Sequence, residues 1–373
     1  MCSYNTSKIP PVGVGSGAWH TCLKWRNTNT PTQAVKSLDR YVYMNLGELS
    51  ESLNSVEIFA REKVSILEDL KARKDKLREE IERITTIRKV KGGKYLSVGA
   101  VDSSFDELFG DDWGRRLYAV CVSGIGFTPN GFTSKKPEWQ IEGLALGYEE
   151  EDDYKRILRG FSLAKEIHSA KEWFSNMDLV LIDGSAKSSI ISINQAMTSK
   201  DLEKSNSGKK LKTIYKETLS ALYDMLDMGM LVFIPKRSSE VFIANKVSST
   251  IKNDYAVLEA ALEPGEYIII DSESVSKLQH WDYTLPKVDS VTEDLLSKLF
   301  SLLKNLKVIY FKSRSGRIEK LETYTPLSAN TLWDFFILEG ENILAYLTDR
   351  SAKEYLKLLK KYARLINPRK YRM

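Results

Sequence analysis

Apolar residues recur every three or four positions along residues 46–84, with glutamate, lysine and arginine between them. The stripe begins at Leu46 and ends at Ile84, and Lys63 and Lys74 interrupt it. This period predicts one or two long helices, and a single helix would reach roughly 60 Å at about 1.5 Å per residue. We therefore predict an N-terminal, coiled-coil-like helical arm over residues 44–91. The stripe fits packing on the arm's own domain and pairing with another chain equally well.

A different pattern follows the arm. Three apolar runs at 95–101, 117–125 and 139–146 are separated by glycine- and proline-containing segments, which is typical of strands joined by hairpins. A helical stripe over 153–176 then leads to the continuous apolar run 179–182, a pattern that favours a buried parallel strand. Three strands followed by alternating helices and strands predict an α/β fold with a mixed sheet flanked by helices.

The rest of the chain continues this alternation. We expect a polar, serine- and lysine-rich interruption at about 184–212, and then, in order, a helix at 213–228, a strand at 231–234, a helix from Ser239, strands near 267–270 and 308–311, and C-terminal helices. Residues 1–43 are rich in Ser, Thr, Asn, Pro and Gly and are predicted to be a flexible extension, so that Met44 is a second possible start. The core is placed at 92–340, and residues 341–373 are predicted to be a C-terminal helix and basic tail.

Composition places the 373-residue chain among ordinary globular proteins, since 42% of its residues are hydrophobic and 28% are charged. Disordered and collagen-like classes are excluded. Its 55 Lys and Arg against 50 Asp and Glu give a formal charge of +5, which permits an anionic partner such as nucleic acid without requiring one. The sequence has no apolar run long enough to span a membrane and no signal-peptide core, so a cytoplasmic location is predicted.

The cysteine and histidine counts limit the kind of metal site. Three cysteines without a CxxC pair and three histidines argue against a disulfide framework and against a His/Cys zinc site. A metal ion would have to be held mainly by carboxylates, which favours Mg²⁺ or Mn²⁺.

Two aspartates follow predicted strands in similar contexts. Asp102 stands in Val-Asp-Ser-Ser and Asp183 in Ile-Asp-Gly-Ser. If a right-handed crossover places strand 179–182 beside strand 95–101, the two carboxylates lie together where α/β proteins bind ligands. Like charges repel unless a divalent cation lies between them. Aspartate and serine are also common turn and helix-cap residues. A purely structural role for the two aspartates is therefore as well supported by the sequence as a metal site.

A third carboxylate is expected on the helix that precedes Asp183. Glu166 borders the buried stripe of that helix, whereas the neighbours of Glu172 are polar, so Glu166 is the better candidate. Three carboxylates can hold one or two ions, one to activate water and one to stabilise the leaving oxygen of a phosphodiester. Lys236 and Arg237, after the strand at 231–234, are candidate phosphate contacts, although a basic turn would look the same.

These segments together resemble the NurA family of archaeal and bacterial nucleases. The segments are Ala100–Ser104 (family pattern AVDGS), Leu179–Ser185, Phe233–Ser239, and the stretch from Ile309 to Leu327. The resemblance covers roughly residues 92–340 and implies an RNase H-like core. It implies a Mn²⁺- or Mg²⁺-dependent deoxyribonuclease, acting as exo- and endonuclease on single- and double-stranded DNA, with Asp102, Glu166 and Asp183 as catalytic metal ligands.

The resemblance also implies partners. A homodimer would resect DNA ends in double-strand break repair together with a HerA-type hexameric ATPase that translocates DNA. The sequence contains no GxxxxGK[ST] motif, so ATP-driven motion would come from that partner. The helical arm is a candidate contact for the dimer or the translocase.

Two departures from the family pattern leave alternatives open. Ser103 replaces the usual glycine, and Asn330 falls where the family often has a histidine or an acidic residue. Asn330 and the nearby Tyr324 are therefore further site candidates without an assigned role. A DNA-binding adaptor of the same fold with weak or lost catalysis is the alternative function, and action on RNA is a third.

Overall fold

The computed structural model describes residues 56–58, 60–61, 64–66, 68–92, 97–110, 115–145, 151–235, 241–247, 253–271, 285–332 and 356–361. The chain divides into two compact units, Met1–Glu62 and Lys63–Met373. In the first unit the described residues are helical. The second unit contains the sheet, its helices and all three predicted carboxylates.

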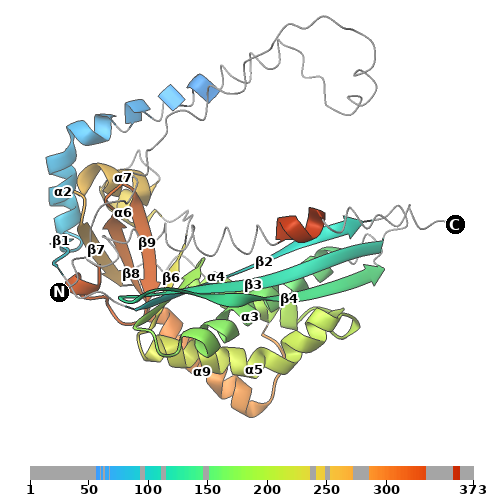
Figure 1. Cartoon of the computed structure of the whole chain (residues 1–373). Helices are drawn as coiled ribbons and strands as arrows, with labels where there is room; N and C mark the ends of the chain where they lie inside the picture. Colours follow the sequence, from blue (N-terminus) through green and yellow to red (C-terminus); the bar gives the residue numbers. More distant parts are fainter. Residues whose placement is uncertain are drawn as a thin grey trace, which may run out of the picture. The chain divides into compact units, whose positions relative to one another are not determined.

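Nine strands of the described residues form one sheet in the order β1-β7-β8-β9-β6-β5-β2-β3-β4 (Figure 1). Strands β2, β3 and β4 are antiparallel to one another, whereas β5 is parallel to β2, and β6 is parallel to β5. Three antiparallel strands followed by two parallel ones confirm the mixed, RNase H-like arrangement. The bounds are β1 Arg88–Lys89, β2 Val98–Gly110, β3 Arg115–Thr128, β4 Gly131–Ala145, β5 Leu179–Asp183, β6 Leu231–Ile234, β7 Glu266–Asp271, β8 Lys307–Lys312 and β9 Ile318–Thr323.

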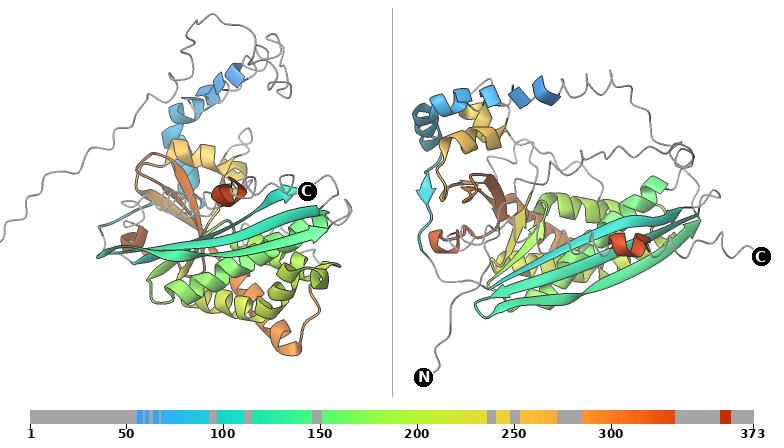
Figure 2. Two further views of the ribbon diagram at one scale, coloured as in Figure 1. Left: turned by 45° about the vertical axis from the view of Figure 1, so that its right-hand side comes forward. Right: turned by 45° about the horizontal axis from the view of Figure 1, so that its top comes forward.

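The helices form two groups. One group covers one face of β2–β6, where Phe174, Leu222 and Leu303 are fully buried (Figures 1 and 2). The other packs against β7, β8 and β9. No helix of the described ranges is long and apolar enough to cross a membrane. The first group is α3 Glu151–Phe174, α4 Ala186–Met197, α5 Asn206–Asp227 and α9 Ser290–Lys304, and the second is α2 Lys74–Glu82, α6 Phe242–Val247 and α7 Asp254–Ala261.

The opposite face of the hairpin strands is also partly covered. A short helical segment at 356–361 places Leu356 against Leu108, Ala119 and Cys121. Lys360 Nζ lies 2.9 Å from the carboxylate of Asp106 on β2. The segment lies within the predicted C-terminal helix.

The strand lengths differ from the predictions. The strand predicted to end at residue 101 continues to Gly110, because β2 pairs with β3 over almost its whole length. Its second half is only half-buried and mixes polar and apolar residues, so hydrophobicity alone does not mark it as a strand.

The prediction of an irregular polar stretch at 184–212 is wrong. Helix α4 occupies Ala186–Met197, and α5 already begins at Asn206. Ile190, Ile193 and Ala196 recur at helical spacing and are fully buried in the core that α3 covers. Serines on the same helix are small enough to be buried between them, which is why the stretch reads as a loop from composition.

Residues 70–81 of the predicted arm pack on their own domain. Leu70, Leu77 and Ile81 are buried against residues of α6 and α7. Helix α2 ends at Glu82, and Arg88–Lys89 form strand β1 beside β7, so the helical pattern stops short of residue 91. Upstream of α2, Ile66 is 51% exposed. Helix α2 therefore packs on its own domain. Pairing with another chain stays a prediction only for the residues before α2.

Truncating Leu77 tests this packing. Leu77→Ala should lower the free energy of unfolding by about 2–5 kcal/mol, because it opens a cavity between α2 and α7. Ile66→Ala, at an exposed position, should change it by less than about 0.5 kcal/mol. Urea unfolding of both variants measures the difference. Equal, small effects would show that α2 does not depend on this contact.

Candidate metal centre

The register between β2 and β5 places Asp102 and Asp183 at the same level of the sheet. Val101 is the Cα partner of Ile182 in a parallel ladder, and each aspartate is the next residue along its strand. Adjacent strands are about 4.8 Å apart. Asp102 is 5% exposed and Asp183 is half-buried. Asp102 was expected at a strand end and instead lies within β2, because the hairpin with β3 extends that strand beyond β5.

The turn after Asp183 needs the glycine of its motif. Gly184 has a φ of 91°, in the region that side chains disfavour, and Ser185 then precedes the first residue of α4. Glu322 of β9 accepts hydrogen bonds from Ser185 Oγ (2.9 Å) and from the backbone N–H of Ala186 (3.1 Å). A carboxylate from a distant strand thus satisfies the start of α4 and fixes the chain directly after Asp183.

Glu322 also forms a buried ion pair with Lys320. Their side chains are 7% and 2% exposed, and Lys320 Nζ lies 3.0 Å from Glu322 Oε1. Sequence reasoning missed both residues, because nothing local indicates that alternate residues of a C-terminal strand meet the turn after Asp183.

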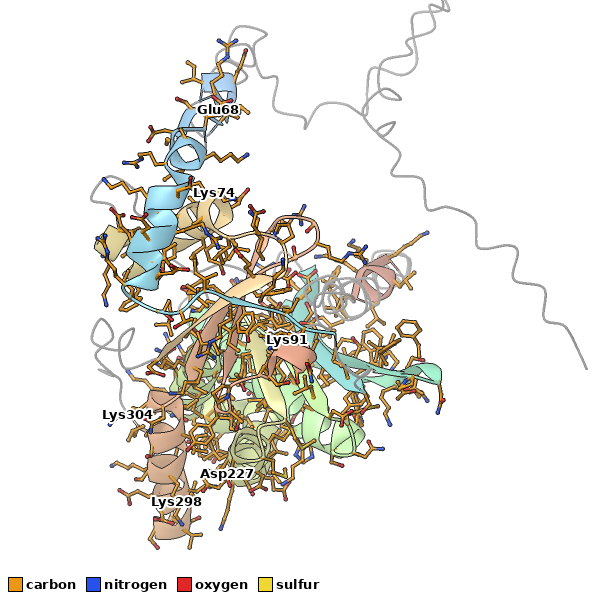
Figure 3. The ribbon with its side chains drawn as sticks, turned by 90° about the vertical axis from the view of Figure 1, so that its left-hand side faces the viewer. Glu68, Lys74, Lys91, Asp227, Lys298 and Lys304 are labelled. Carbon is orange, nitrogen blue, oxygen red and sulfur yellow. The ribbon has the colours of Figure 1, made fainter. Side chains whose placement is uncertain are left out.

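Removing the charge of Glu322 should destabilise the fold. Glu322→Gln should lower the free energy of unfolding by about 3–5 kcal/mol, since one member of a buried ion pair is lost. Asp294→Asn is the matched control: its partner Lys298 lies on the outward side of α9, and the pair is exposed (Figure 3). We expect a clearly smaller loss there, because solvent screens an exposed ion pair. Urea unfolding compares them, and a Glu322→Gln loss no larger than the control's would contradict the role of Glu322.

Glu166 reaches β2 from helix α3. Its side chain is 2% exposed, and Oε2 accepts a 2.6 Å hydrogen bond from Ser103 Oγ. Oε1 is buried and accepts no hydrogen bond from any residue in the described part of the chain. Glu172, the weaker candidate on the same helix, is exposed. Glu166 is therefore the buried one of the two carboxylates, and its role as a metal ligand stays a prediction.

The three carboxylates interact electrostatically. Burial raises the pKa of Glu166 well above its usual value, and the negative charges of Asp102 and Asp183 raise it further, while the Ser103 hydrogen bond acts in the opposite direction. Burial and the Asp102 charge likewise raise the pKa of the Cys121 thiol to about 12. The three carboxyl groups are thus close enough to disfavour one another's ionised forms.

The carboxylates approach from two sides of the sheet. Val101 and Ile182 face the core under α3, whereas Ala100 and Leu181 belong to the core on the other face. Because side chains alternate along a strand, Asp102 and Asp183 point away from α3, and Ser103 points towards it. Among the described residues, no three or more His, Cys, Asp and Glu side chains are spaced as ligands of one ion. Glu166 and the two aspartates would have to approach further to share a cation.

The donor set nevertheless fits a hard divalent cation. All three side chains offer oxygen, and Mg²⁺ and Mn²⁺ prefer oxygen ligands. The buried Oε1 of Glu166 is an acceptor without a donor in the described ranges, and a cation would satisfy it.

The other predicted site residues lie elsewhere or outside the described ranges. Lys236 and Arg237 fall in the segment 236–240, outside the described residues. Asn330 is exposed on a short helical segment, and Tyr324 is half-buried against the core that α3, α5 and α9 cover. The roles of both residues stay predictions.

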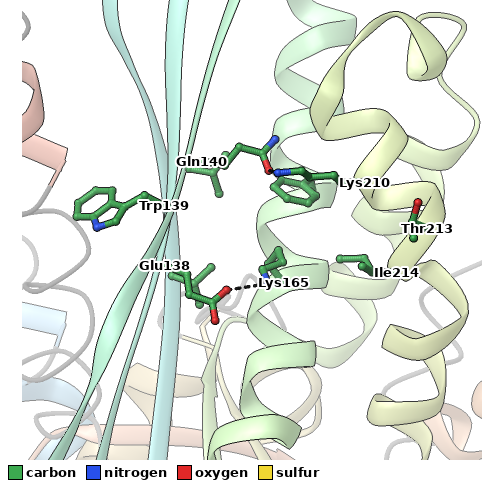
Figure 4. Close-up of a pocket in the computed structure, with 10 residues that line it drawn as sticks. Glu138, Trp139, Gln140, Lys165, Lys210, Thr213 and Ile214 are labelled. Atoms are coloured by element: carbon green, nitrogen blue, oxygen red, sulfur yellow. Dashed lines mark hydrogen bonds and ion pairs between the residues drawn. The ribbon is translucent and has the colours of Figure 1, made fainter.

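A separate cavity of about 350 Å³ lies between strands β3 and β4 and helices α3 and α5. Its polar residues are already paired: Lys165 Nζ lies 2.7 Å from Glu138, and Lys210 Nζ donates to Gln140 at 2.9 Å (Figure 4). Trp139 points to the opposite side of the sheet. The cavity thus faces α3, away from the direction in which Asp102 and Asp183 point.

The sheet order and the three carboxylates define an RNase H-like α/β protein with an acidic centre at β2, β5 and α3. The NurA nuclease from Sulfolobus solfataricus shares this fold, with a TM-score of 0.52 at 15% identity over 84% of this chain and 95% of that one. A second NurA structure gives a TM-score of 0.47 at 14% identity, covering 80% and 94% of the two chains. Human ENDOV gives 0.29 at 12% identity, covering 78% and 98%.

The likeness to the Sulfolobus solfataricus protein carries the conclusion on the fold, since the other two TM-scores are below 0.5. No protein-family model matches the sequence. No curated protein matches it either. The predicted NurA-like fold is confirmed at the level of structure.

Proposed function

We propose that this protein is a metal-dependent DNA nuclease that hydrolyses phosphodiester bonds, with Mn²⁺ or Mg²⁺ bound by Asp102, Glu166 and Asp183. One observation carries the proposal: three carboxylates, two of them almost fully buried, interact electrostatically where β2, β5 and α3 meet in an RNase H-like sheet. Such a group is unfavourable for folding alone, and a divalent cation would compensate it.

Each residue of the proposed site would have a separate role. Asp102 and Asp183, level on neighbouring strands, would hold the cation from one side, and Glu166 would offer Oε1 from α3. A bound cation would supply an activated water and stabilise the leaving oxygen. Glu322 would keep the chain after Asp183 in place through Ser185 and Ala186. Lys236 and Arg237 are proposed as phosphate contacts on the basis of their sequence alone.

We also propose the finer assignments that follow from the NurA resemblance. They are exo- and endonuclease action on single- and double-stranded DNA, resection of DNA ends in double-strand break repair, a homodimer, and a HerA-type hexameric ATPase as partner. The motifs around Asp102 and Asp183 and the shared fold support them. The net charge of +5 is compatible with DNA as the partner.

A second candidate is a DNA-binding adaptor of the same fold with weak or no catalysis. Two features favour it: Ser103 stands where the NurA motif has glycine, and the described carboxylates are not already spaced as ligands of one ion. Both candidate functions include DNA binding, and they differ in whether the protein cleaves the DNA.

A cleavage assay separates them. The full chain is incubated with end-labelled single-stranded DNA, duplex DNA and RNA, each with Mn²⁺, Mg²⁺ or EDTA. We expect DNA shortening with Mn²⁺ or Mg²⁺ and none with EDTA. DNA retention in gel shifts without shortening under any metal would favour the adaptor, and cleavage of RNA alone would redirect the proposal to RNA.

A further inference from the structure

Two serines connect β2 to α3 through hydrogen bonds that end on Glu166. Ser162 Oγ donates to Ser103 Oγ at 2.8 Å, and Ser103 Oγ donates to Glu166 Oε2 at 2.6 Å. Ser162 is 4% exposed and Glu166 is 2% exposed, and Ser103 between them is half-buried. One oxygen of Glu166 is therefore fixed, and the other, Oε1, accepts no bond within the described ranges.

The sequence explains why these three side chains meet. Ser162 and Glu166 are four residues apart on α3 and therefore share one face of the helix. Ser103 follows Asp102 on β2 and points to the opposite side, towards α3. Consecutive residues of β2 therefore have different roles. Asp102 is a candidate cation ligand, and Ser103 holds a second candidate ligand, Glu166. The glycine of the NurA motif, which Ser103 replaces, has no side chain with which to make this bond.

We propose that Ser103, supported by Ser162, is a positioning residue that orients Glu166 so that Oε1 binds the catalytic cation. The inference rests on the proposed metal-dependent nuclease function. A carboxylate that is free to rotate would spend part of its time with neither oxygen directed at the ion. Partners that hold a ligand's second atom typically contribute about 10–100-fold to metal affinity.

Mn²⁺ binding to the full chain without DNA tests the proposal, with the EPR signal of free Mn²⁺ as the readout. Ser103→Ala should weaken Mn²⁺ affinity about tenfold or more, and Ser103→Thr, which keeps the hydroxyl, should bind within about threefold of wild type. Ser162→Ala should show a smaller loss, about two- to tenfold, because it acts through Ser103. Ser169→Ala is the matched control: it is another fully buried serine of α3, and it should bind as wild type does.

Thermal unfolding of each variant without metal separates positioning from stability. If Ser103→Ala lowers Tm and leaves Mn²⁺ affinity at the wild-type value, the serine only ties α3 to β2, and the proposal is overturned. Equal losses for Ser103→Ala and Ser103→Thr would also overturn it, because the hydroxyl would then not be the cause.

Asp183→Asn in the same titration distinguishes this inference from the proposed function. If wild type binds Mn²⁺, Asp183→Asn does not, and Ser103→Ala matches wild type, the metal site stands and the positioning role alone fails. If neither wild type nor any variant binds Mn²⁺, the proposed function fails and the role of Ser103 fails with it.

Discussion

Asp183→Asn should lower metal-dependent DNA cleavage by roughly a thousandfold, or to background, without unfolding the protein. The substitution keeps the shape of the side chain and removes the charge that would hold the cation beside Asp102. Metal catalysis contributes several kcal/mol to the transition state, and each 1.36 kcal/mol is about a tenfold change in rate. Asp102→Asn is expected to have the same effect, because both residues lie at one level of the sheet. Initial rates on end-labelled DNA with Mn²⁺ measure it.

The control for this prediction is Glu172→Gln, which removes an exposed carboxylate from α3 and should leave the rate within about twofold, the size of an ordinary surface change. A circular dichroism melt would confirm that each variant is folded. Cleavage that persists at the wild-type rate in both Asp102→Asn and Asp183→Asn would show that the cation is not held there.

The second large effect concerns stability and pH. In EDTA, the free energy of unfolding of the wild type should decrease as pH rises from about 4.5. Glu166→Gln should not show this decrease. The folded-state pKa of Glu166 is raised, chiefly by burial and then by Asp102 and Asp183. The folded state therefore keeps a proton that the unfolded state releases near its ordinary pKa. Stability falls from that pH up to the raised pKa, with a slope of at most about 1.4 kcal/mol per pH unit.

Urea unfolding of wild type and Glu166→Gln at pH 4.5 to 8 measures this difference. The two curves should separate with rising pH, and the glutamine variant should be the more stable at pH 8. Glu172→Gln should run parallel to wild type, because its side chain is exposed. With saturating Mn²⁺ the wild type should regain stability, about 2.7 kcal/mol at 100 times Kd. A wild type that becomes more stable than Glu166→Gln as pH rises in EDTA would contradict the raised pKa.

The local pattern was enough to predict the parts of the fold that are both regular and buried. The apolar strand before Asp183 and the helix before it were found at nearly their observed bounds, because a fully buried element shows its period directly. The pairing of Asp102 with Asp183 followed from crossover handedness, although Asp102 proved to lie within a longer strand.

The remaining features depend on contacts that are distant in the sequence. The second half of β2 is held by pairing with β3, which hydrophobicity does not report. Helix α4 resembles a loop in composition because its buried face uses small serines. The contact of Glu322 with the start of α4 joins residues over 130 positions apart.

The hydrogen bond from Ser103 to Glu166 is likewise invisible in the sequence, where the serine appeared only as a departure from a motif. The helical spacing of Ser162 and Glu166 was the one local signal that could have indicated it.

The proposed metal site can be located directly by anomalous scattering from Mn²⁺ in a crystal of the protein with DNA. We expect an anomalous peak between β2, β5 and α3, with oxygens of Asp102, Asp183 and Glu166 Oε1 all within about 2.5 Å of it. A peak elsewhere, or DNA bound over this face with no metal at the three carboxylates, would contradict it.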